Sequence, residues 1–197
     1  GHEMGLKVFG SLNVFAGGHN YFDRGVVYQD KGAWQSICYH NGKLTPISEI
    51  KSNYNCMMNP SNPEVQAYQI DILKEFARKY PEVDGLIFDR VRYDGITADF
   101  SELSKKQFEE YAGVTVENFP EDILSWYDEE GNLRSNWVLG KYAKQWIEWR
   151  AGVIHDFVVK AHEALKEINP DLIIGDYTGA WYPTYWQLGV NWASKEY

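Results

Sequence analysis

The sequence predicts an α/β fold in which helices cover a parallel β-sheet. Three short segments, residues 7–15, 86–90 and 172–176, are apolar on both faces, as strands inside a parallel sheet are. Segments with helical periodicity separate them, and this alternation of strand and helix is typical of parallel sheets. Apolar residues make up 44% of the 197 residues, which is enough to form a packed core.

The first strand is expected at residues 7–15, a β-prone stretch that lies between glycine residues. Side chains alternate along a strand, so Phe9, Ser11 and Asn13 share one face. Residues 16–61 have no sustained hydrophobic period, and we expect a long irregular loop there. Such a loop is usually functional or disordered, but six aromatic residues argue against disorder: Tyr21, Phe22, Tyr28, Trp34, Tyr39 and Tyr54.

Residues 62–80 give the clearest helix prediction in the chain. Asn62 is a favourable N-cap, Pro63 suits the first helical position, and Glu64 complements the N-terminal end of the helix dipole. Apolar side chains then recur at helical spacing as far as residue 80. A strand of nearly continuous apolar character is expected to follow at residues 86–90.

The second half of the chain predicts two short helices, a turn, a long helix and a last strand. The short helices are expected at residues 102–111 and 121–127, and the turn at residues 128–132. The long helix is expected at residues 138–168, where apolar residues form one stripe. The strand at residues 172–176 comes next, and the aromatic-rich tail after it shows no clear period.

Two of the predicted strands end in a carboxylate, Asp89 in LIFDR and Asp176 in LIIGD. Parallel α/β folds bind ligands at the carboxyl ends of their strands, so these aspartates are the candidate catalytic residues. Arg90 and Arg92 follow Asp89, and a nearby cation keeps a carboxylate ionised, which suits a nucleophile or an electrostatic stabiliser. A structural alternative stays open: Asp89 caps the next loop or forms an ion pair with one of these arginines.

Several classes of function are disfavoured by the sequence. The formal net charge of −9 repels nucleic acid. No glycine-rich phosphate loop, paired metal-binding His or Cys residues, or G-x-S-x-G motif occurs, so no metal or cofactor is expected. No apolar run approaches the roughly 20 residues of a membrane helix. The spacing of Cys38 and Cys56 leaves open whether they pair or stay free.

Aromatic residues make up 16% of the chain, about twice an ordinary share. The flat C–H faces of sugar rings stack on aromatic side chains, so aromatic loops beside strand-end carboxylates favour a carbohydrate cleft. In the alternative, these rings cover the core or form a subunit contact, and the sequence does not set the oligomeric state. The tail contributes several of these rings: Trp181, Tyr182, Tyr185, Trp186 and Trp192.

Several motifs resemble those of the glycoside-hydrolase-like family ten. MNPSNPEV at residues 58–65 is similar to the family's L-N-P-x-x-P-E-V helix start. DGLIFD at residues 84–89, followed by Arg92–Tyr93, resembles its D-G-I-x-F-D-D-Y-x-Y-P strand end. Further similar segments, in the same order along the chain, are HEMGLKV at residues 2–8, Trp149–Arg150 and EINP at residues 167–170.

The resemblance implies a (β/α)8 TIM barrel that acts on polysaccharide or oligosaccharide. The predicted strands would be about the third to fifth of the barrel, and residues 1–197 a single domain, the central part of a larger catalytic barrel. Asp89 would then end the fourth strand, where related barrels often carry a catalytic carboxylate. The chain departs from the family pattern in having Arg90 for the usual second Asp and Asp94 for the usual Pro, and Asp176 fits only with a one-residue shift.

We therefore expect a glycoside hydrolase that uses paired carboxyl groups, with Asp89 as nucleophile or transition-state stabiliser. The proton donor would be Asp176 or a residue on a later strand. The alternative is a non-catalytic carbohydrate-binding barrel, which Arg90 favours. By family analogy the protein is periplasmic, on the cell surface or secreted, although residues 1–10 show no signal peptide. The candidates for sugar binding are Asn13, Asn59, Arg92, Tyr93, Arg150, Tyr177 and Trp181.

Overall fold

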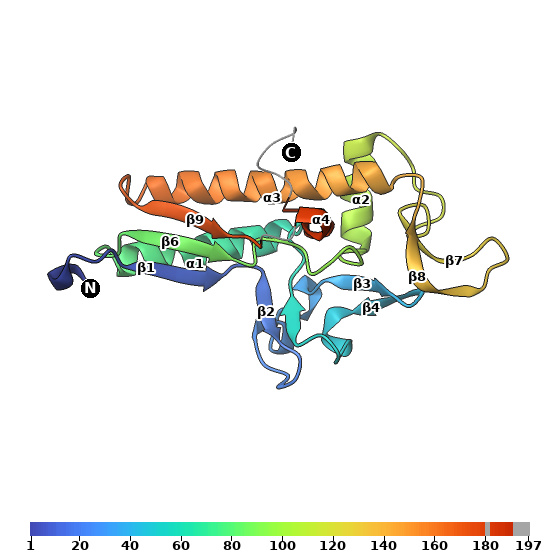
Figure 1. Ribbon diagram of the computed structural model, residues 1–197, viewed down its shortest axis with the longest axis horizontal. Coiled ribbons are helices and arrows are strands. Elements are labelled where there is room, and N and C mark those ends of the chain that lie inside the picture. The colour runs from blue at the N-terminus through green and yellow to red at the C-terminus, as the bar shows by residue number, and fades with distance from the viewer. Residues whose placement is uncertain (180–181, 191–197) are drawn as a thin grey trace.

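Three parallel strands form the central sheet of the computed structural model, which describes residues 1–179 and 182–190 (Figure 1). The strands are β1 (Phe9–Asn13), β6 (Gly85–Asp89) and β9 (Ile173–Tyr177), with β6 in the middle. Both pairings are parallel, which confirms the predicted sheet. The carboxyl ends of the three strands therefore meet at one edge.

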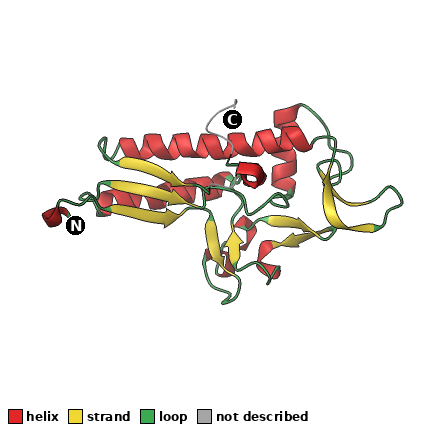
Figure 2. Cartoon of the chain, in the orientation of Figure 1, coloured by secondary structure: helices red, strands yellow, loops and turns green. Residues whose placement is uncertain are grey.

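Two long helices cover one face of this sheet (Figure 2). α1 (Pro63–Lys79) and α3 (Ala143–Lys166) contact each other and contribute to the same core. Leu86 and Phe88 of the central strand are buried in that core. The alternation of β6 therefore turns Gly85, Ile87 and Asp89 toward the opposite face.

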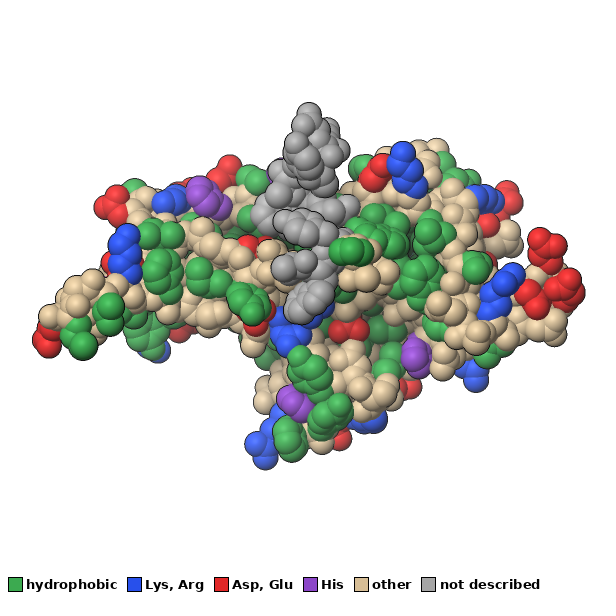
Figure 3. Space-filling model, viewed as in Figure 1, with side chains coloured by type: hydrophobic (Ala, Val, Ile, Leu, Met, Phe, Trp, Pro, Cys, Tyr) green, Lys and Arg blue, Asp and Glu red, His purple; other side chains and the backbone are tan. Residues whose placement is uncertain are grey.

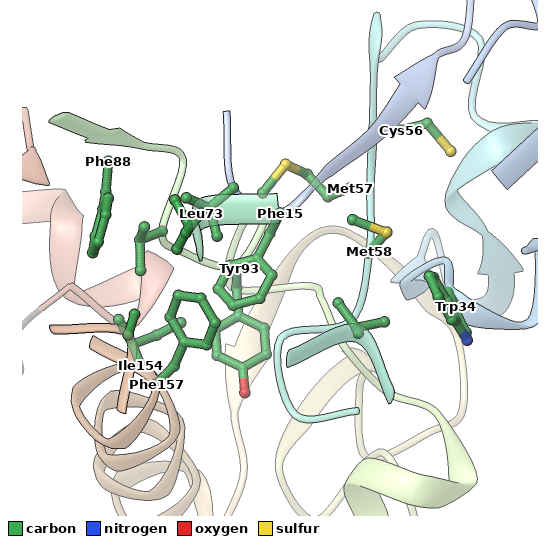
Figure 4. Packing of buried hydrophobic residues seen from close by; sticks show 14 of the residues in the cluster. Phe15, Trp34, Cys56, Met57, Met58, Leu73, Phe88, Tyr93, Ile154 and Phe157 are labelled. Carbon is green, nitrogen blue, oxygen red and sulfur yellow. The ribbon is translucent and has the colours of Figure 1, made fainter. Parts of the chain in front are cut away.

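The core continues beyond the sheet into the segment that follows β1 (Figure 4). The rings of Phe15 and Phe157 lie 4.8 Å apart, which joins this segment to α3. Met57 and Met58 are fully buried in the same cluster. One hydrophobic core thus fixes the loops at the carboxyl edge of the sheet to the helices behind it.

The start of α1 confirms the capping signal in the sequence, and the next helix, α2 (Glu102–Ala112), is capped in the same way. The side chain of Asn62 accepts a hydrogen bond of 2.9 Å from the backbone N–H of Glu64 at the start of α1. The Ser101 hydroxyl accepts one of 3.2 Å from the Ser104 N–H at the start of α2. These caps satisfy backbone donors that have no partner within the helix.

The other face of the sheet is open among the described residues. Phe9 and Ile173 flank Gly85 in one row of this face, and their side chains are 43% and 41% exposed. A Cβ on Gly85 would lie 2.3 Å from the Phe9 ring. Glycine is thus required in the central strand for the aromatic ring of its neighbour to lie across it.

The prediction of an irregular loop over residues 16–61 is wrong. This segment contains four short strands, which form two antiparallel pairs, β2 with β5 and β3 with β4. Each has three or four residues, too few to show a hydrophobic period, and β2 and β5 are far apart in sequence. The bounds are β2 (Ala16–His19), β3 (Ile37–His40), β4 (Lys43–Pro46), β5 (Asn55–Met57) and the 3-10 helices η2 (Val26–Tyr28), η3 (Gly32–Trp34) and η4 (Ile47–Glu49).

A hairpin replaces the short helix predicted at residues 121–127. β7 (Leu124–Tyr127) pairs antiparallel with β8 (Leu133–Leu139), and the turn predicted at residues 128–132 connects them. Because β8 takes up residues as far as Leu139, α3 begins later than the predicted start at residue 138. The Trp126 indole N–H donates to the carbonyl of Tyr39, a long-range contact that local spacing cannot show.

The remaining elements are short. η1 (His2–Met4) precedes β1, and α4 (Tyr182–Tyr185) and η5 (Trp186–Leu188) follow β9. Cys38 and Cys56 are both free thiols in the core. In the part of the chain that the structure describes, no helix is long and apolar enough to cross a membrane.

Candidate functional site

A row of three side chains lies at the carboxyl edge of the sheet. The register pairs Asn13 of β1 with Asp89 of β6, and Asp89 with Tyr177 of β9. Residues in one row point to the same face, here the open face, with Asp89 in the middle. Tyr177 is 72% exposed. The structure therefore brings together three residues that the sequence singled out, and we call them the strand-end row.

Asp176 lies beside this row but not in it. Its register partner is Phe88, so alternation turns its side chain toward the helix-covered face rather than the face of Asp89. No hydrogen-bond partner for its buried Oδ2 is found within residues 1–179 and 182–190. Burial, and next the negative charge of Asp89, raise the pKa of Asp176 to about 6. A carboxyl group with this pKa holds its proton at mildly acidic pH, as a general acid must.

The Asp89→Asn substitution is expected to lower the pKa of Asp176, because it removes the negative charge that disfavours ionisation there. Burial still acts, so the pKa should fall below about 6 but stay above the ordinary value of 3.8. Carboxyl-carbon NMR titration of the protein would measure this shift. Asp71→Asn, at an exposed position of α1, is the matched control and should leave the pKa of Asp176 unchanged. A pKa of Asp176 that does not respond to Asp89→Asn would show that the two groups are not coupled.

Arg90 adopts an unusual backbone conformation directly after Asp89. Its φ angle is 57°, in the left-handed region that non-glycine residues rarely occupy. The guanidinium lies 5.4 Å from the centre of the Tyr54 ring and donates a hydrogen bond to the Tyr54 hydroxyl. Among the described ion pairs, none joins Asp89 to Arg90 or Arg92. The ion-pair alternative for Asp89 therefore has no support in this geometry.

Arg92 stabilises the loop that follows β6. Its Nη1 donates to the carbonyl of Tyr93 at 3.0 Å. The neighbouring Asp94 carboxylate accepts a hydrogen bond of 2.7 Å from the side chain of Asn53. Burial raises the pKa of Asp94, and the Asn53 hydrogen bond opposes that effect. The Nη1 group of Arg92 is thus engaged in a hydrogen bond within its own loop.

Arg150 and Tyr93 are buried together, although both were candidates for sugar binding. Each is fully buried, and the Arg150 guanidinium lies 4.2 Å from the centre of the Tyr93 ring. Arg150 Nη2 donates to the carbonyls of Gly95 at 2.7 Å and Gln187 at 3.1 Å. It therefore joins the loop after β6 to the segment after β9. This geometry favours a supporting role behind the site rather than contact with a sugar.

Asn59 lies in a buried polar cluster around Asp99 and is 3% exposed. Its amide donates to Asp99 Oδ2 at 2.8 Å, and its carbonyl oxygen accepts from the N–H and hydroxyl of Ser61. Burial raises the pKa of Asp99, while hydrogen bonds from Ser101 and Ser104 act in the opposite direction. Asn59 thus uses its polar atoms inside the protein, which favours a structural role. Trp181, another sugar-binding candidate, lies outside the described residues.

The sequence did not single out one further group near the strand-end row. The rings of His19, Tyr21, Phe22 and Tyr54 gather on the surface around β2 and β5, and we call them the exposed aromatic group. Tyr21, Phe22 and Tyr54 belong to the loop aromatics that favoured a carbohydrate cleft, but the sequence does not show that they meet one another or His19. The only local signal is the run HNYF, because Tyr54 joins it through the long-range pairing of β2 with β5.

In residues 1–179 and 182–190, no three side chains of His, Cys, Asp or Glu are placed so that they could hold one ion.

Comparisons with known proteins agree with this architecture. The family model "Glycosyl hydrolase-like 10" matches residues 26–194. An S-layer-related protein of Niallia circulans is 30% identical over 206 residues, which include 99% of this chain but only 12% of that protein.

Two solved structures share the fold at low sequence identity. The glycoside hydrolase domain of PgaB (BpsB) from Bordetella bronchiseptica is 15% identical, with a TM-score of 0.62 over 94% of this chain and 46% of that one. The β-galactosidase from Bacillus circulans sp. alkalophilus is 12% identical, with a TM-score of 0.53 over 85% of this chain and 26% of that one. The chain thus spans less than half of each solved relative.

Proposed function

Because the chain belongs to the glycosyl hydrolase-like 10 family, as its motifs predicted, we propose that it is part of a glycoside hydrolase that cleaves O-glycosidic bonds in a polysaccharide or oligosaccharide. The observation that carries the proposal is Asp89, at the carboxyl end of the central strand and on the open face. Asn13 and Tyr177 flank it in the strand-end row. TIM-barrel enzymes carry their catalytic residues at this edge of the sheet, and most glycoside hydrolases use a pair of carboxyl groups.

We further propose that residues 1–197 are the central part of a larger TIM-barrel catalytic domain. Three adjacent parallel strands with helices on one face support this proposal, since they would be neighbouring β/α units of such a barrel. The other face carries the exposed side chains of Phe9 and Ile173, and in a closed barrel that face would be covered by the strands opposite. The 46% share of the PgaB domain that the chain spans is consistent with this proposal.

In the proposed reaction Asp89 acts at the anomeric carbon of the sugar. As a carboxylate it attacks this carbon or stabilises its developing positive charge, and the bond to the leaving oxygen breaks. A protonated carboxylic acid gives its proton to that oxygen, and water then completes the hydrolysis. Asn13 and Tyr177, which flank Asp89 in the register, would bind sugar hydroxyls on either side of it.

Asp176 is the candidate within this chain for the proton donor. Its pKa of about 6 suits the role, since the group is partly protonated in mildly acidic solution. Its position on the helix-covered side of the sheet opposes the role, because the two carboxyl groups of a glycosidase flank one bond. The alternative proton donor is a residue on a later strand of the proposed barrel.

Activity of the full-length protein on a panel of polysaccharides and oligosaccharides tests the proposal. Release of new reducing ends from at least one glycan is expected, with products identified by mass spectrometry. We expect the protein to act outside the cytoplasm, as the S-layer-related relative suggests, so cell-wall and capsular polysaccharides belong in the panel. If a glycan binds but no new reducing ends are released, the hydrolase proposal is contradicted.

That outcome would support the second candidate, a non-catalytic carbohydrate-binding barrel. The specific observation in its favour is Arg90, which stands where the family pattern has a second Asp. Its guanidinium is held against the Tyr54 ring and does not supply a second carboxyl group beside Asp89. Calorimetry would then show binding of a glycan, and the bound glycan would be recovered intact.

A further inference from the structure

The exposed aromatic group is an unusual concentration of accessible rings. Tyr21, Phe22 and Tyr54 are 58%, 69% and 45% exposed. The His19 ring lies 4.7 Å from that of Phe22, 5.3 Å from that of Tyr21 and 5.8 Å from that of Tyr54. Figure 3 shows hydrophobic side chains gathered around a histidine at the tip of the lobe that β2 and β5 form. A contiguous exposed apolar patch usually marks a binding surface.

The backbone beneath these rings is held by a dense set of hydrogen bonds. Asn20 is 1% exposed, and its side chain donates to the carbonyls of Ile47 at 2.9 Å and Asn53 at 2.8 Å. The same side chain accepts a hydrogen bond of 2.6 Å from the Tyr28 hydroxyl. The Asn20 N–H donates to the carbonyl of Tyr54 at 2.8 Å. The rings therefore project from a fixed platform, and binding a ligand would cost little ordering of the backbone.

Arg90 connects this platform to the strand-end row. It follows Asp89 directly in the chain, and its side chain reaches the Tyr54 ring and hydroxyl. The guanidinium carries five N–H donors, more than this one hydrogen bond uses. A ligand chain that runs from Asp89 across Arg90 would therefore arrive at the exposed aromatic group.

We propose that His19, Tyr21, Phe22 and Tyr54 form a glycan subsite, on which a pyranose of the substrate chain stacks while Arg90 donates to its oxygens. The ligand class is a β-linked polymer of gluco-configured sugars, because their equatorial substituents leave flat C–H faces. This inference rests on the proposed function, since it places the subsite beside the bond that Asp89 attacks.

A glycan fits this surface better than a protein partner does. A specific protein interface takes about 20–30 residues on each side, whereas one sugar ring needs only one or two aromatic side chains. Three of the four rings carry a polar nitrogen or hydroxyl at their edge, which suits a ligand made of hydroxyl groups. The group is also continuous with the proposed catalytic edge through Arg90.

The test measures binding separately from hydrolysis. The full-length Asp89→Asn protein, with Tyr54→Ala or Phe22→Ala added, is titrated calorimetrically with β-linked hexasaccharides of glucose and of N-acetylglucosamine. We expect the Kd of a hexasaccharide that binds the Asp89→Asn protein to rise about tenfold with either added variant. Tyr111→Ala, which removes a ring that is 57% exposed on α2, is the matched control and should leave the Kd unchanged. Thermal melts should show the same folded state for all variants.

The outcomes separate this inference from the proposed function. Hydrolysis by the wild-type protein with a KM unchanged by Tyr54→Ala and Phe22→Ala would overturn the subsite and leave the hydrolase proposal standing. A tenfold loss of binding in a protein that never hydrolyses the sugar would support the subsite and favour the non-catalytic barrel. If neither hexasaccharide binds the Asp89→Asn protein, the proposed ligand class is wrong.

Discussion

The Asp89→Asn substitution in the full-length protein is expected to lower the rate of glycan hydrolysis by about 10³-fold, the order of the loss when a group that stabilises transition-state charge is removed. Asparagine has nearly the same shape but cannot form a glycosyl ester or neutralise a developing positive charge. Because Asp89 ends the central strand and lies between Asn13 and Tyr177, the exchange should leave the sheet intact. Release of reducing ends from the best substrate of the panel measures the effect.

Asp71→Asn is the control for this experiment. Asp71 is an exposed residue of α1, and its exchange removes the same charge without touching the carboxyl edge of the sheet. Activity should stay at the wild-type level. Equal turnover by the Asp89→Asn and wild-type proteins would eliminate Asp89 as the catalytic carboxylate.

The second large effect is expected on stability, from Asp99→Ala. The Asp99 carboxylate is fully buried and accepts hydrogen bonds from the backbone N–H groups of Ile37 and Ser101 at 2.6 and 3.0 Å. It also accepts bonds from Asn59 at 2.8 Å, from Ser104 at 2.6 Å and from the Ser101 hydroxyl. Alanine would leave these buried donors without an acceptor, which should lower the free energy of unfolding by about 3–5 kcal/mol.

Urea denaturation followed by tryptophan fluorescence measures this loss as a lower midpoint. Asp156→Ala on the exposed side of α3 is the matched control, and its midpoint should hardly change because surface substitutions usually alter stability by less than about 0.5 kcal/mol. The Asp99 cluster joins the start of β3 to the start of α2. A midpoint of Asp99→Ala equal to that of the control would show that the cluster does not hold these elements together.

Arg150 illustrates why the site was predicted only in part. The sequence places it in a Trp–Arg pair of a long helix, where a cation beside a carbohydrate site is a reasonable candidate for sugar binding. The fold turns it inward, over the Tyr93 ring and onto the carbonyls of Gly95 and Gln187. No local pattern contains that information, because these partners lie 37 to 57 residues away in sequence. Asn59 is a similar case, because its partner Asp99 lies 40 residues away in sequence.

The sequence by itself determined the three parallel strands, α1, α2 and Asp89 at a strand end. These features depend on hydrophobic period, helix caps and chain order, all of which are local. Only the tertiary structure decided which side chains meet. The sheet register put Asn13 and Tyr177 in the row of Asp89 and turned Asp176 to the other face, because a shift of one residue reverses the direction of a side chain. The pairing of β2 with β5 likewise brought Tyr54 to His19 and Phe22, a contact between segments that no local period links.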